Sequence, residues 1–289
     1  MNKHLNFYSL LQYNMISSCL MGGLGNQLFQ IFTCISLSIS SQTSFEFNIT
    51  EKPIGGTIRN SYWITFFRAL YKSFITEQHK YEFLREQHFT YDPIIIPNKH
   101  ASYKLFGYFQ SYKYFDSNKE TIFNLIQLEM LKCGVLKKMD VSSNNYISMH
   151  FRIGDYKFIQ ESHPVLSVQY YENALELLQQ LIPEFVSIPI IYFYEKKDEK
   201  DVLEKITHLK RKFKNKFIPI SDKLTDWEQL LIMSQCKYNI IANSTFSWWG
   251  AYLNTIENQV VCYPDTWFGG AIQHDTKDLF MDKWIKITI

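Results

Sequence analysis

From residue 146 to residue 263 the chain alternates short β-rich apolar runs with longer amphipathic runs, and no other feature constrains the fold as strongly. Strands that alternate with helices form parallel sheets that are covered on both faces. We therefore expect an α/β unit in the second half of the chain. The pattern predicts strands at 146–151, 188–194, 217–220, 238–241 and 260–263, and helices at 168–181, 197–213, 226–234 and from 245 onward.

The first half of the chain opens with the same order of elements. An apolar run at 15–21 enters a glycine-rich turn at 22–27, and a helical pattern follows. The length of 289 residues is too great for one compact α/β lobe and suits two lobes of about 130–150 residues each. Because residues 132–145 are polar and include a glycine, they are the expected connection between lobes at 1–140 and 141–289.

The segment from Tyr238 to Leu253 reads as a buried strand that feeds a helix through a capping turn, Asn243-Ser244-Thr245. Free backbone amides at a helix start, flanked by two hydroxyl groups, form a typical phosphate site. The segment therefore predicts a phosphorylated ligand. The alternative is an ordinary helix cap beside a buried pair of tryptophans.

A second cluster of polar residues, His150 to Tyr156, follows the strand expected at 146–151. Open α/β sheets bind ligands at the carboxyl ends of their strands. Alternation along the extended chain places His150 and Arg152 on one face. Arg152 can hold a phosphate through two hydrogen bonds, and His150 can hydrogen-bond a base or a phosphate. The alternative is a structural ion pair between Arg152 and Asp155.

The glycine-rich turn matches the dinucleotide fingerprint only in part. Gly23 and Gly25 are in place, but Leu28 occupies the third glycine position and no acidic residue clearly ends the next strand. This argues against a nicotinamide cofactor. The glycines are expected to let the backbone approach a ligand or the other lobe, with Asn26 and Gln27 as donors facing the cleft. A purely structural tight turn remains the alternative.

Composition excludes several classes of function. With 30 basic and 28 acidic residues, the chain carries no charge excess that would suggest nucleic acid binding. Its five cysteines are dispersed without a C-x-x-C pair, which argues against a zinc site or a disulfide framework. No apolar run is long enough to span a membrane, and the first residues lack the core of a signal peptide. We therefore expect a cytoplasmic protein for which peripheral membrane association is possible.

Five segments in this order make the chain similar to glycosyltransferase family 11, whose members are mainly α-1,2-fucosyltransferases. They cover about residues 15–265 and read MGGLGNQLFQ (21–30), GYFQSYKYF (107–115), HFRIGDY (150–156), HPVLSVQYYENAL (163–175) and NSTFSWWGAYLN (243–254). The resemblance implies a GT-B-type α/β fold with two Rossmann-like lobes and a cleft between them. The first lobe would lie on the acceptor side, and the second would bind the donor.

The resemblance also implies the reaction. L-fucose would pass with inversion from GDP-β-L-fucose, the donor substrate, to the 2-hydroxyl of a terminal galactose, in bacterial O-antigen or polysaccharide biosynthesis. No cofactor and no metal are expected, and the sequence contains no D-x-D pair. Three alternatives stay open: another fucosyl linkage, a non-catalytic relative that binds a GDP-sugar or a glycan, and, remotely, a Rossmann oxidoreductase.

The family's H-x-R-R-x-D motif falls on His150, Arg152, Ile153 and Asp155. The resemblance assigns Arg152 to the donor diphosphate, and His150 and Asp155 join it as expected catalytic residues. Ile153 stands where the family has a second arginine, so one cation is missing. No general base is identified, and the candidates in the following loop are Asp155, Glu161 and His163.

The remaining donor contacts are carried over in the same way. Asn26 matches the cleft-facing asparagine of the glycine turn. Glu195 stands where the family often has S-D-D, and we expect it to accept hydrogen bonds from guanine N1 and N2. The alternative is a solvated glutamate at a helix start. Together with His150 and Arg152, the residues expected to bind the donor are Gly25, Asn26, Glu195, Asn243, Ser244, Thr245 and Phe246.

Overall fold

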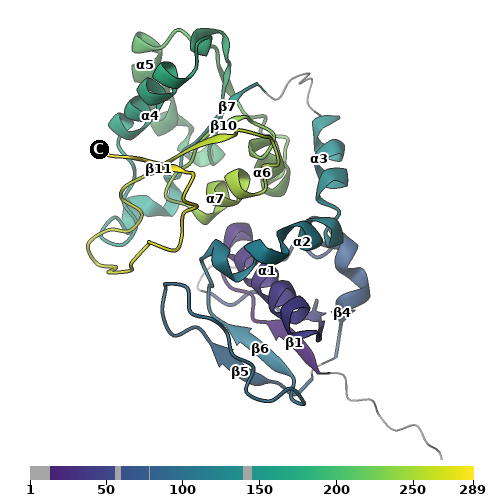
Figure 1. Ribbon diagram of the computed structural model, residues 1–289. Helices are drawn as coiled ribbons and strands as arrows, with labels where there is room; N and C mark the ends of the chain where they lie inside the picture. Colours follow the sequence, from purple (N-terminus) through teal and green to yellow (C-terminus); the bar gives the residue numbers. More distant parts are fainter. Residues whose placement is uncertain (1–13, 56–59, 78, 139–144) are drawn as a thin grey trace, which may run out of the picture.

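The computed structural model describes residues 14–55, 60–77, 79–138 and 145–289, and these form two α/β lobes (Figure 1). The first lobe contains a four-stranded sheet and a two-stranded sheet, and its elements are β1 (Met15–Ser18), α1 (Leu24–Ser41), β2 (Ser44–Phe45), β3 (Phe47–Asn48), β4 (Phe74–Ile75), β5 (Glu82–Arg85), β6 (Tyr103–Phe106), α2 (Lys119–Leu125) and α3 (Leu128–Leu136). The second lobe contains a six-stranded sheet, and its elements are β7 (Ile147–His150), α4 (Val168–Leu181), β8 (Ile190–Phe193), α5 (Glu199–Lys212), β9 (Phe217–Pro219), α6 (Asp226–Met233), β10 (Tyr238–Ile240), α7 (Thr245–Tyr252), β11 (Val260–Pro264) and β12 (Ile285–Ile287).

The sheet of the second lobe is parallel throughout and has the strand order β12-β11-β10-β7-β8-β9. Strand β7 lies in the middle of the sheet, and β8 and β9 are added in order on one side of it. Strand β10 then pairs with the other side of β7. This reversal leaves a crevice between the carboxyl ends of β7 and β10, which is where open α/β sheets bind ligands. The expected α/β fold is confirmed, and the two segments singled out in the sequence both end at this crevice.

Both faces of this sheet are buried, as strand β8 illustrates. Ile190 and Tyr192 pack into the cluster that contains α4 and α5, whereas Ile191 and Phe193 pack into the cluster that contains α6 and α7. All four side chains are buried because successive side chains of a strand point to opposite faces. The apolar run is therefore continuous, as expected for a covered parallel sheet.

The sheet of the first lobe is also parallel, in the order β2-β1-β6-β5, and α1 packs against β1. The two lobes meet where α1 packs against α7 (Figure 1). Trp248 and Trp249 of α7 are fully buried there, and both rings contact Phe29 of α1 at centroid distances of 4.5 and 5.0 Å. The tryptophan pair therefore joins the lobes and is not exposed to a sugar.

Several boundaries differ from the prediction. Residues 119–136 form two helices and not one, because Gln127, whose φ of 57° lies in the left-handed region, separates α2 from α3. The connection expected from residue 132 begins later, because α3 continues to Leu136 and includes Gly134. The division between residues 140 and 141 lies outside the described residues. Within the described part of the chain, no helix is long and apolar enough to cross a membrane.

Candidate active site

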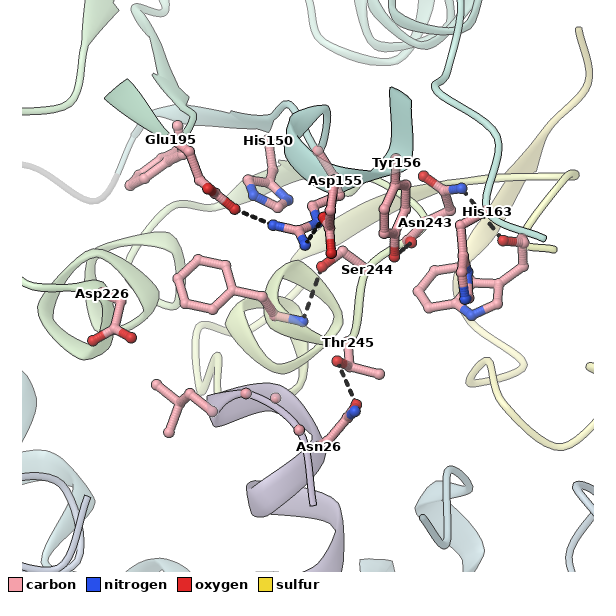
Figure 2. A pocket seen from close by; sticks show the side chains of 18 of the residues that line it. Asn26, His150, Asp155, Tyr156, His163, Glu195, Asp226, Asn243, Ser244 and Thr245 are labelled. Atoms are coloured by element: carbon pink, nitrogen blue, oxygen red, sulfur yellow. Dashed lines mark hydrogen bonds and ion pairs between the residues drawn. The ribbon is translucent and has the colours of Figure 1, made fainter. Parts of the chain in front are cut away.

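A cleft of about 810 Å³ lies between the lobes at the carboxyl ends of β7 and β10. Its volume is in the range of small-molecule binding sites, about 300–1,000 Å³. The first lobe contributes the glycine turn and parts of the loops near residues 60, 89 and 108. In Figure 2, Glu195 and Asp226 lie toward one end of the cleft and Tyr156 and His163 toward the other.

Two helix starts meet at the centre of the cleft. The amino ends of α1 and α7 come together so closely that a Cβ atom on Gly25 would lie 2.5 Å from the carbonyl carbon of Thr245. Thr245 Oγ1 donates a hydrogen bond of 2.9 Å to Asn26 Oδ1, and Gln110 Nε2 donates one of 3.3 Å to the same oxygen. Gly25 therefore permits contact with the other lobe, as the sequence suggested, and both helix dipoles present their positive ends here.

This close approach predicts different effects for two glycines of the same turn. Gly25→Ala forces the two helix starts apart, and we expect a loss of about 1–3 kcal/mol in the free energy of unfolding. Because misplacement by about 1 Å can cost up to about 100-fold in rate, a reaction catalysed in this cleft should slow at least about tenfold. Gly23→Ala is the matched control, since a Cβ atom there meets nothing within 4 Å and its φ is −81°. Equal effects of the two substitutions, measured by urea unfolding and initial rates, would contradict this interpretation.

The α7 cap is formed by Ser244, whose Oγ accepts a hydrogen bond of 3.3 Å from the backbone N–H of Phe246. Asn243 is buried, and its Nδ2 donates to the carbonyl oxygens of Pro164 and Trp267 at 2.9 and 3.3 Å. The Asn243 amide nitrogen therefore holds two loops at the rim of the cleft. Because the Thr245 hydroxyl donates its proton to Asn26, the groups left to face an anion at this helix start are backbone N–H groups and the Ser244 hydroxyl.

Arg152 lies just beyond β7, at the crevice, and forms ion pairs with Asp155 and Glu195. Glu195 also pairs with Lys197 at 2.6 Å, and the Arg152 guanidinium lies 4.9 Å from the centroid of the Tyr156 ring. Burial acts to lower the pKa of Arg152, but Tyr156, Asp155 and Glu195 outweigh it and the pKa is raised. The ion pair anticipated between Arg152 and Asp155 is present, and Arg152 carries a fixed positive charge in the cleft.

His150 is buried beside this arginine, with its ring 5.5 Å from that of Phe246. Burial, with a smaller contribution from Arg152, lowers the pKa of His150 to about 3. The imidazole is therefore neutral at neutral pH. Its Nδ1 has no hydrogen-bond partner among the described residues. His150 can thus offer a hydrogen bond to a ligand but adds no positive charge.

Two neighbouring residues lie differently from the expectation. Gln27 is expected from the sequence to face the cleft, but it is fully buried and its Nε2 donates to the carbonyl oxygens of Gly22 and Asn60 at 3.0 and 2.9 Å. Its long side chain reaches these carbonyls and fixes the turn instead. Ile153, at the position of the family's second arginine, is buried in the core of the second lobe. In this chain that position therefore does not face the cleft.

Sequence reasoning missed a pair of polar residues at the Glu195 end. The Tyr62 hydroxyl donates a hydrogen bond to Asp226 Oδ2, which links the first lobe to the start of α6. Both residues line the cleft. They are 164 positions apart and neither belongs to a local motif, so nothing in the sequence identified them.

The described residues contain no group of three or more His, Cys, Asp or Glu side chains arranged to hold a metal ion. The charged groups around the crevice are instead an arginine, its carboxylate partners and helix starts. Arginine side chains and helix starts are groups that bind anions in proteins, and here the arginine is paired with two carboxylates.

Two α/β lobes with parallel sheets and a cleft between them form the architecture of GT-B-type glycosyltransferases. The chain belongs to glycosyl transferase family 11, whose family model matches residues 58–288. The resemblance noted in the sequence is thereby confirmed. An O-antigen biosynthesis glycosyltransferase, WbnK, from Escherichia coli is 30% identical, over 93% of this chain and 99% of that protein. An α-1,2-colitosyltransferase, also from Escherichia coli, is 27% identical over 65% of this chain and 63% of that protein.

Solved structures with detectable similarity are more distant. A family 9 glycosyl transferase from Veillonella parvula aligns with 96% of this chain and 87% of its own, at 11% identity and a TM-score of 0.46. ADP-heptose lipopolysaccharide heptosyltransferase II from Escherichia coli aligns with 54% of this chain and 42% of its own, at 17% identity and a TM-score of 0.36. At these scores the sheet topology of the chain itself remains the basis for the fold assignment.

Proposed function

We propose that this glycosyltransferase moves L-fucose from GDP-β-L-fucose to the 2-hydroxyl of a terminal galactose, with inversion and without a metal ion. One observation carries the proposal: Arg152 and the start of α7 share the crevice between β7 and β10 with the start of α1. These are the groups that a departing diphosphate requires when no metal balances its charge.

In the proposed complex the diphosphate lies between Arg152 and the backbone N–H groups that follow Ser244. As the bond between the fucosyl C1 and the phosphate lengthens, negative charge grows on the leaving oxygen and is stabilised by the guanidinium and the helix dipole. His150, held neutral by burial, contributes a hydrogen bond. The acceptor hydroxyl attacks C1 from the opposite face, which inverts the configuration.

Guanine is proposed to bind at the end of the cleft that contains Glu195. This carboxylate is half-buried, and the ion pairs with Lys197 and Arg152 outweigh the effect of burial and lower its pKa. It is therefore ionised and able to accept from guanine N1 and N2. Because its two oxygens already contact Arg152 and Lys197, guanine would replace the exposed Lys197.

The relatives favour a bacterial surface glycan as the acceptor, since one of them is named for O-antigen biosynthesis. They also provide a second candidate donor, because another is named an α-1,2-colitosyltransferase. Colitose is L-fucose without its 3-hydroxyl. The two donors therefore differ at one hydroxyl of the sugar and share the proposed diphosphate and guanine contacts.

A nucleotide panel tests the proposed donor. We expect GDP and GDP-fucose to raise the melting temperature in the presence of a chelator, and UDP, ADP and NAD to leave it unchanged. The ratio of kcat/KM values for GDP-fucose and GDP-colitose then decides between the two sugars. Stabilisation by UDP or NAD in place of GDP would contradict the proposal.

A further inference from the structure

The end of the cleft opposite Glu195 is walled by aromatic rings from both lobes. His163 stacks on Tyr156 with a centroid distance of 5.0 Å and meets Phe268 at 5.6 Å. Phe268 in turn contacts Phe89 of the first lobe at 5.3 Å, and Phe89 stacks on His274 at 4.6 Å with the rings parallel within 1°. All five residues line the cleft and none of them was assigned to the donor, so this wall is available to the second substrate.

Tyr156 and His163 form the part of this wall that adjoins Arg152. The guanidinium of Arg152 contacts the Tyr156 ring, and His163 contacts the same ring (Figure 2 labels Tyr156 and His163). A sugar whose diphosphate is bound by Arg152 therefore has Tyr156 and His163 next along the cleft. This places the imidazole where the reacting hydroxyl and the fucosyl C1 would meet.

The surroundings of His163 keep it neutral. Its half-buried position lowers the pKa of the imidazole, Asp155 acts to raise it and Arg152 acts to lower it further. Asp155 and Arg152 are the charged groups that act on His163. Two further titratable groups are close to it: Tyr156, on whose ring it stacks, and His274, which contacts the other side of Phe268. A neutral imidazole at neutral pH has a free lone pair on one ring nitrogen and can accept a proton.

The two other candidate bases are less suited. Asp155 is paired with Arg152, the group that must hold the diphosphate. Glu161 does not line the cleft, and its backbone carbonyl accepts a hydrogen bond of 2.8 Å from the N–H of Ala271. Asp155 lines the cleft but is held in an ion pair, and Glu161 does not line it. His163 lines the cleft and contacts its neighbours through ring stacking.

We propose that the aromatic wall binds the acceptor sugar and that His163 is the general base of the transfer, an inference that rests on the proposed function. Phe89 and Phe268 provide a surface for the apolar face of a pyranose ring. The acceptor O–H gives its proton to the free imidazole nitrogen while its oxygen forms the bond to the fucosyl C1. The bond from C1 to the phosphate oxygen breaks, and its electron pair leaves with GDP.

The test compares the variants His163→Gln and Phe89→Ala with the unmodified enzyme, with transfer to a galactoside measured from pH 5 to 9. Because general base catalysis contributes about 100- to 10,000-fold, His163→Gln should lower kcat by that factor and keep GDP affinity. It should also lose the acid limb of the pH–rate profile, which a merely structural residue would not affect. Phe89→Ala should raise the acceptor KM and retain the acid limb. Added imidazole should restore part of the activity of His163→Ala.

The outcomes separate this inference from the proposed function. An active enzyme whose His163→Gln variant keeps its rate within threefold and its acid limb contradicts the role of His163. Loss of the acid limb in Asp155→Asn instead would assign the base to Asp155 and also contradict it. An enzyme that transfers no sugar at any pH, although it binds GDP, contradicts the proposed function and this inference together.

Discussion

Replacing Arg152 by alanine is expected to lower fucosyl transfer by about 1,000-fold while the protein remains folded. Arg152 is a cation at the crevice between the lobes, and no metal is proposed to share the charge of the leaving diphosphate. Its carboxylate partners, Asp155 and Glu195, are about half exposed and stay solvated when the arginine is removed. The measurement is kcat/KM for the donor, with the far-UV circular dichroism spectrum as a check on folding.

Lys197→Ala is the matched control for Arg152→Ala. Lys197 pairs with the same Glu195 carboxylate at 2.6 Å, but it does not line the cleft. We therefore expect its removal to change the rate by less than about threefold, since exposed ion pairs contribute about 0–1 kcal/mol. Arg152→Lys keeps the charge but loses the two-pronged hydrogen-bonding geometry. Its kcat/KM should therefore lie between those of Arg152→Ala and Lys197→Ala. Near-normal activity of Arg152→Ala would contradict the role given to this residue.

Trp249→Ala should have the largest effect on stability, a loss of about 3–5 kcal/mol in the free energy of unfolding. The side chain is fully buried where α7 meets α1, and its ring lies 4.5 Å from that of Phe32 and 5.2 Å from that of Phe115. One hydrophobic cluster runs across both lobes at this point, so the intact protein should unfold in a single transition in urea. A cavity at the junction should uncouple the lobes and give two transitions.

The control for Trp249→Ala is Phe185→Ala, which removes a buried ring that packs against Phe213 inside the second lobe. We expect it to shift the urea midpoint and to preserve one transition. Trp249→Phe should recover part of the lost stability, because an aromatic ring still fills the junction. If the free energy of unfolding of Trp249→Ala lies within about 1 kcal/mol of that of the original protein, this contact does not hold the lobes together.

The second lobe is largely predictable because its signals are local. The helix expected at 168–181 matches α4 residue for residue, and Ser244 caps α7 as its position before an aromatic helical run suggests. Arg152 and Ser244 each follow a buried strand, and this position in the sequence is sufficient to place both residues at the carboxyl ends of the strands. Local periodicity and capping residues are sufficient for such elements.

The first lobe is less predictable for a physical reason. Strand β2 has only two residues, and three of the four residues in β5 are exposed, so neither shows an alternating pattern. Strand β12 at the edge of the larger sheet also has a short, mixed sequence. Such strands form because neighbouring strands supply their hydrogen bonds, and that information is absent from a local window.

The same limit applies to the candidate site. The pair of Tyr62 and Asp226 and the contact between Phe89 and Phe268 both join distant parts of the chain across the cleft. The prediction for Gln27 is wrong because only the folded turn shows which carbonyl groups its amide can reach. Motifs therefore locate the charges of the proposed donor site, whereas the aromatic wall arises from tertiary packing.

The central claim is that this cleft transfers fucose from GDP-fucose to a galactoside without a metal ion. The most direct test incubates the enzyme with GDP-fucose and lactose, N-acetyllactosamine or a β1,3-linked galactoside in the presence of EDTA, and determines the product linkage by NMR. We expect an α-fucosyl residue on the 2-hydroxyl of galactose, formed at the same rate with and without the chelator. A different linkage, a requirement for a divalent ion, or GDP binding without transfer to any galactoside would contradict the claim.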